Sequence, residues 1–239
     1  MRKRKGVQFN CFSPPVMVAT IIIELCLALY TVVRYKMNEL TRLATLTLVM
    51  LATFQLCEFF VCTNDAGHII GWSRFGFAAI TTLPPLGLHI LHVLAHKPRR
   101  RLVMTAYATM VAYIGIYLFM SNVFNSYQCA GNYVIFHLRA HVGGVYWFYY
   151  FGWIVTAMAL GFRWLTESSI KRNDRQRQAI QGLIIGWLVF IVPTALVNIL
   201  NPSTTAGIPS IMCGFAVLFA LILTLYILPR AARLKANQG

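Results

Sequence analysis

Apolar residues form seven long runs that fill nearly all of this chain of 239 residues. Each run is bounded by charged or turn-forming residues and is long enough for a helix to cross a hydrocarbon layer of ~30 Å. The runs lack the alternation typical of membrane barrels, and an unpaired backbone is costly in lipid, so helices are predicted. The expected spans are 13–35, 43–62, 75–96, 102–124, 145–165, 179–200 and 209–229.

The composition supports lipid as the main solvent of this chain. Hydrophobic residues make up 58% of the sequence and charged residues only 11%, which is more apolar surface than one soluble core can hide. The connections between runs are short, so consecutive helices should be antiparallel neighbours. We therefore predict an all-α membrane protein, with residues 1–239 forming one domain, a bundle of seven transmembrane helices.

Lysine and arginine are concentrated after the first, third, fifth and seventh spans. By the positive-inside rule this predicts an N-terminus outside and a C-terminus inside, although the basic residues 2–5 oppose that orientation. The net charge of +15 is spread over short connections, which favours contact with anionic lipid headgroups over nucleic acid. A bacterial cytoplasmic membrane is the expected location.

Two acidic residues, Glu24 and Glu58, lie inside predicted spans, where an ionised group is expensive. Glu58 is four residues from the outer end of its span and is expected to be able to meet Arg74, at the outer start of the next. One interpretation is a structural pair that fixes helix packing. The other is an outward-facing ligand pocket, whose candidate residues are Glu58, Trp72, Arg74, Asn122 and Asn198.

Prolines interrupt two of the predicted spans. Pro84 and Pro85 fall in the middle of the third span and Pro193 in the middle of the sixth. Each removes an internal hydrogen bond and can bend its helix. They are candidate hinges, with packing alone as the alternative.

The third span carries His89, His92 and His96 on one helical face. His89 and His92 are candidate ligands for a metal or haem. A second helix would have to supply further ligands, and the sequence predicts no acidic residue at their depth. The alternative is that these histidines pack and form hydrogen bonds.

Two outer segments, 63–74 and 125–144, are longer than the other connections. They are interpreted either as a lid over an entrance or as interfacial anchors rich in aromatic residues. Cys62 and Cys129 lie beside these segments in the expected oxidising compartment, so a disulfide between them is one reading and two unpaired thiols the other.

Three short stretches carry a resemblance to a known family: Glu58 followed by Trp72, the stretch Leu83-Pro-Pro-Leu-Gly-Leu-His89, and the last span from Gly207-Ile-Pro-Ser210 to Leu225-Tyr-Ile-Leu-Pro229. In these positions the chain resembles the seven-helix N-terminal sensor region of some bacterial histidine kinases. The resemblance implies a bundle that senses a signal at the membrane or its outer face. Only nine residues follow Arg230, so signalling is expected to need a separate partner.

The sequence favours a non-enzymatic sensory or ligand-binding module that acts through a protein partner in the membrane or cytoplasm. One alternative is an accessory or structural subunit of a larger membrane complex. Another is an intramembrane enzyme that uses a metal or haem at His89 and His92. No cofactor is required by the sequence.

Overall fold

The computed structural model describes residues 14–63, 69–97, 100–120, 123–130 and 133–236. Nearly all of these residues are helical, and two short strands form the described sheet. The elements are α1 (Pro14–Arg34), α2 (Glu39–Thr63), α3 (Ile69–Thr81), α4 (Leu83–Ala95), α5 (Arg100–Phe119), β1 (Phe124–Ala130), β2 (Tyr133–Leu138), α6 (Ala140–Leu165), α7 (Ser168–Lys171), α8 (Asp174–Leu200), η1 (Pro202–Gly207), α9 (Ile208–Leu221), the π-helical η2 (Ile222–Ile227) and α10 (Leu228–Ala236).

Seven helices within the described residues are long and apolar enough to cross a membrane, as the sequence predicts. Two of these spans are composite. α3 and α4 form one span, and α9, η2 and the start of α10 form another. The large apolar side chains left exposed on α1 and α5 fit lipid as their solvent.

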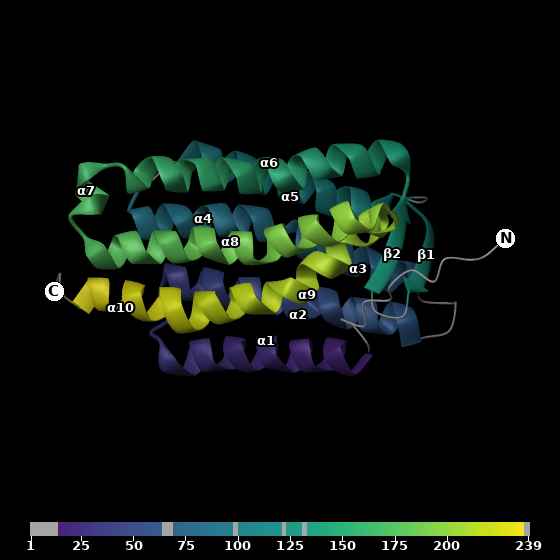
Figure 1. The fold of residues 1–239 in the computed structure, drawn as a ribbon, viewed down its shortest axis with the longest axis horizontal. Coiled ribbons are helices and arrows are strands. Elements are labelled where there is room, and N and C mark those ends of the chain that lie inside the picture. Colours follow the sequence, from purple (N-terminus) through teal and green to yellow (C-terminus); the bar gives the residue numbers. More distant parts are fainter. Residues whose placement is uncertain (1–13, 64–68, 98–99, 121–122, 131–132, 237–239) are drawn as a thin grey trace.

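The helices lie side by side along the long axis of the molecule, with the strands β1 and β2 at one end and α7 at the other (Figure 1). We call these the hairpin end and the basic end, because Arg34, Lys97, Lys171 and Arg230 belong to connections or helix ends near α7. α1 begins at the hairpin end and α10 lies at the basic end (Figure 1). The two ends of the described chain are therefore on opposite sides, as an odd number of spans requires.

The fourth membrane span, helix α5, is shorter than expected. α5 ends at Phe119, and the chain then forms the antiparallel hairpin of β1 and β2 in place of more helix. Strand pairing satisfies backbone groups that an irregular loop would leave open. The segment 125–144, expected to be a long connection, thus consists mainly of this hairpin and the first turn of α6.

A disulfide ties the hairpin to the helix bundle. It joins Cys62 near the end of α2 to Cys129 in β1, with the Cα atoms 5.9 Å apart. This is the pair suggested by the sequence. Cys26, Cys57 and Cys213 are free thiols.

The double proline lies at the junction of α3 and α4. Pro84 and Pro85 are in the first turn of α4, where a missing N–H costs little because it would have no helical partner. The hydroxyl of Thr82 donates to the carbonyl of Ala79 at 2.7 Å. Pro193, in contrast, lies inside α8, which continues to Leu200.

Close backbone approach joins α8 to α9 and η2. Gly182 and Gly186 of α8 lie four residues apart on one face, and they face Tyr226 and Phe219 respectively. Small residues at this spacing let membrane helices pack without a side chain between them.

Candidate functional site

A buried polar network crosses α1, α2 and α9 in the half of the bundle nearer the hairpin. Thr20 and Glu24 are four residues apart on α1, and Gln55 and Glu58 are three apart on α2, so each pair occupies one helical face. All four side chains are buried. Because α1 and α2 pack against each other, the two faces meet.

Gln55 is the centre of this network. Its amide nitrogen Nε2 donates to Oε1 of Glu24 at 3.4 Å and to the backbone carbonyl of Cys213 in α9 at 3.1 Å. The hydroxyl of Thr20 donates to the amide oxygen of Gln55. One side chain thus links three spans.

Glu58 lies at the hairpin side of the network. Its carboxyl group interacts with the side chain of Ser210 in α9. The same Ser210 oxygen accepts a hydrogen bond from the backbone N–H of Val134 in β2, at 3.2 Å. The hairpin is therefore connected to the buried carboxyl group through one intervening side chain.

Each of the two carboxyl groups has an oxygen without a hydrogen-bond donor: Oε2 of Glu24 and Oε1 of Glu58. A buried polar atom without a partner destabilises a protein, and in hydrocarbon the cost is larger because water cannot replace the donor. These two acceptors are suited to a ligand that brings its own N–H or O–H group.

Arg74 does not pair with Glu58, contrary to the expectation from their depth. Its guanidinium donates to the carbonyls of Leu118 at 3.3 Å and Met120 at 3.1 Å, and no ion pair to Glu58 is formed. α5 ends at Phe119, and the last carbonyls of a helix have no helical donor. A cation is also favoured there by the helix dipole.

The other candidate pocket residues make separate contacts. The ring of Trp72 stacks on Phe60 with the centroids 4.5 Å apart. The side-chain oxygen of Asn198 accepts from the hydroxyl of Thr205 at 2.9 Å, which links the end of α8 to η1. Asn122 lies outside the described residues. None of these contacts joins Trp72, Arg74 or Asn198 to Glu58.

His89 and His92 have different partners. Nδ1 of His89 is 3.1 Å from the hydroxyl of Tyr107, and Nε2 is 3.3 Å from Oε1 of Glu39. Nδ1 of His92 is 2.9 Å from the carbonyl of Leu88.

The expectation that no acidic residue lies at this depth is therefore wrong. The side chain of Asn38 caps α2 by accepting from the N–H of Thr41 at 3.1 Å, so the helix begins earlier than predicted and carries Glu39 to His89. Among the described residues, no three His, Cys, Asp or Glu side chains gather as a metal site.

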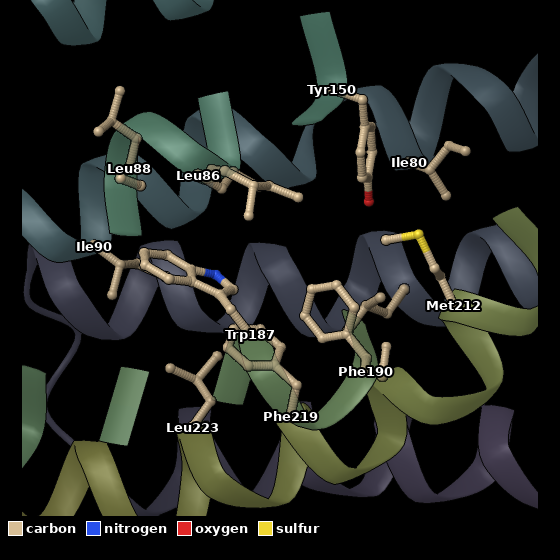
Figure 2. Close-up of a cluster of buried hydrophobic side chains, with 14 of the residues drawn as sticks. Ile80, Leu86, Leu88, Ile90, Tyr150, Trp187, Phe190, Met212, Phe219 and Leu223 are labelled. Carbon is tan, nitrogen blue, oxygen red and sulfur yellow. The ribbon is translucent and has the colours of Figure 1, made fainter. Parts of the chain in front are cut away.

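An apolar cavity of about 30 Å³ adjoins the polar network at Cys213. Its wall includes Leu83, Pro84 and Gly87, which follow the break between α3 and α4. Figure 2 shows aromatic and sulfur-containing side chains around this space, from α6, α8 and α9. They are Tyr150, Trp187, Phe190, Met212 and Phe219.

Sequence reasoning identified Glu24 and Glu58 but missed Thr20, Gln55 and Ser210. The spacings of Thr20 to Glu24 and of Gln55 to Glu58 were a usable signal, because polar side chains on one face of an apolar helix seek a polar partner. The partnership of α1 and α2 with α9 requires the tertiary structure.

The chain matches no model of a known protein family, and a search of curated proteins gave no match either.

Proposed function

We propose that this protein is a membrane-embedded sensory or ligand-binding module that acts through a separate protein partner. The ligand class that fits is a small molecule with an apolar body and a hydroxyl or amine group. The observation that carries the proposal is the pair of donor-free carboxyl oxygens of Glu24 and Glu58. They belong to a network in which Gln55 bonds to Cys213, a residue of the cavity wall.

The cavity suggests how binding is coupled to movement. At about 30 Å³ it holds little more than a water molecule, so a ligand enters only if the surrounding helices part. Its wall includes the first turn of α4 and Phe219, three residues before the π-helical η2. Breaks and π segments are places where helices change direction at low cost. A ligand that favours the open arrangement shifts the population toward it.

The proposed orientation places the hairpin end outside the cell and the basic end inside. Two independent features support it. A disulfide at the hairpin end fits an oxidising compartment, and the lysines and arginines at the other end fit the positive-inside rule. The resemblance to the sensor region of bacterial histidine kinases implies the same orientation.

The test uses Glu58→Gln, which keeps the side-chain shape but changes the carboxyl group to an amide. Protein is extracted from its native membrane in mild detergent, and bound small molecules are identified by mass spectrometry. Wild type should retain an apolar compound with a donor group, and Glu58→Gln about fivefold less, because a hydrogen bond to a carboxylate is about 1 kcal/mol stronger than one to an amide oxygen. Asp174→Asn, the same chemical change at an exposed site, is the control.

Partner recovery completes this test. Cross-linking in membranes should capture a protein whose yield changes with Glu58→Gln and not with Asp174→Asn. Equal retention of the small molecule by wild type and both variants would count against the proposed site. Ligand loss without any change in partner recovery would contradict the signalling role alone.

A second candidate, an accessory subunit of a larger complex, is favoured by α5. Only 11% of the residues in the apolar stretch of this helix are buried, a smaller share than in any other described span. An exposed helix face docks on another helix as readily as on lipid. A discrete complex larger than this chain, seen on native electrophoresis and lost when Val111 on this face is changed to Trp, would support this function.

A further inference from the structure

A groove of about 520 Å³ opens at the basic end, whereas the carboxyl network lies in the half of the bundle nearer the hairpin. Four segments form it: the end of α1 with the turn that follows, the start of α2, the end of α4, and the junction of η2 with α10. One part of its wall is apolar and includes Leu40, Val93 and Leu228. The other part carries Arg34, Lys36 and His96.

The charge of the groove is of one sign. Its described lining residues include no aspartate or glutamate. Glu39 is close in sequence, but its carboxylate contacts His89 at 3.3 Å. Arg230, also close in sequence to the groove, donates to Gln178 and to the carbonyl of Tyr226. The groove therefore presents cations to an anion, beside an apolar surface.

His96 occupies a backbone position that normally belongs to glycine. Its φ is 51°, and among the described residues other than glycine it alone has a positive φ. The N–H of His96 donates to the carbonyl of Val93 at 3.3 Å, and the N–H of Lys97 donates to the carbonyl of His92 at 3.1 Å. These are the two hydrogen bonds of a Schellman motif, which ends a helix. A side chain costs some strain in this conformation, and here the imidazole it carries lines the groove.

We propose that this groove binds the phosphate group of an anionic phospholipid. Arg34, Lys36 and His96 surround the phosphate, and an acyl chain lies along Leu40, Val93 and Leu228. Basic pockets between membrane helices are suited to such headgroups because the phosphate finds both charge and hydrogen-bond donors at the bilayer surface. The apolar wall favours a lipid over a free phosphate.

Native mass spectrometry of the detergent-solubilised protein tests this site. Short-chain phosphatidylglycerol, short-chain phosphatidylcholine and glycerol phosphate are titrated separately. Phosphatidylglycerol should bind at least tenfold more tightly than the other two. The double variant Arg34→Gln, Lys36→Gln should weaken its binding about thirtyfold, since each cation at the surface contributes about fivefold.

The control double variant is Lys171→Gln, Arg172→Gln, which removes the same charge at the same end but outside the groove. It should leave the phosphatidylglycerol affinity within about twofold of wild type. An equal loss in both double variants would show diffuse electrostatic attraction and overturn the site. Equal affinity for phosphatidylglycerol and phosphatidylcholine would overturn it as well.

Two further outcomes refine the assignment. His96→Gly should raise the melting temperature by relieving the positive φ while weakening phosphatidylglycerol binding several-fold. A higher melting temperature with unchanged binding would remove His96 from the site. Glycerol phosphate binding as tightly as phosphatidylglycerol would keep the phosphate site and overturn the lipid as its source.

Discussion

Arg74 shows how a single side chain completes a helix end in this bundle. Its guanidinium supplies the donors that the carbonyls of Leu118 and Met120 lack once α5 has ended. Equal depth made Glu58 look like its partner, but depth along a helix does not fix the direction of the side chain around it. A nearby helix terminus offers a cation both hydrogen bonds and a favourable dipole.

Replacing Arg74 by Gln should lower the free energy of unfolding by about 1–3 kcal/mol, because the partly buried carbonyl of Leu118 and the exposed carbonyl of Met120 lose a charged donor. Chemical or thermal unfolding in detergent measures this. Combining Arg74→Gln with Glu58→Gln should give additive effects within about 0.5 kcal/mol, as expected for residues that do not interact. A coupling above about 1 kcal/mol would show that the two side chains form a pair after all.

The buried carboxyl groups were predictable one residue at a time, and their network was not. Glu24 and Glu58 stand out because charged residues are rare in apolar runs. The role of Gln55 depends on a carbonyl of Cys213, 158 residues further along the chain. No sequence spacing carries that information.

At the scale of elements, apolar runs predicted the helices well and their ends poorly. The cap at Asn38 extends α2 to Glu39 and so gives His89 its acidic neighbour. The hairpin also had a signal in the sequence, because Gly131 and Asn132 separate two runs that contain aromatic residues, the second of which also has Val134 and Ile135. Its aromatic content favoured the interpretation as anchors or a lid.

Contact between α8 and α9 is the element pairing most sensitive to side-chain size. A Cβ atom on Gly186 would lie 2.6 Å from the ring of Phe219. Gly186→Ala should therefore destabilise the protein by about 1–3 kcal/mol through overpacking. Gly152→Ala on α6 is the matched control, since nothing lies within 4 Å of its Cβ position. Equal melting temperatures of the two variants would contradict this close approach.

At the scale of the whole molecule, the count of spans and the charge of the connections lead to one arrangement. Seven spans put the start of α1 and the end of α10 on opposite sides of the bundle. Which side faces the cytoplasm is part of our proposal and rests on the positive-inside rule.

Cysteine labelling in intact cells tests this orientation. A cysteine replacing exposed His137 in β2 should react with a membrane-impermeant maleimide, and one replacing exposed Ser168 in α7 should react only after the cells are opened. The reverse pattern would invert the proposed orientation. The unmodified protein measures the background labelling of its native cysteines, Cys11 and Cys26 among them.

The bond between Cys62 and Cys129 closes a covalent ring, because the two residues are 67 positions apart and α3, α4 and α5 lie between them. A protease that cuts once between these cysteines would leave a molecule that still migrates as one piece until a reductant is added. Two spans of the bundle, Ile69–Ala95 and Arg101–Phe119, lie within this ring.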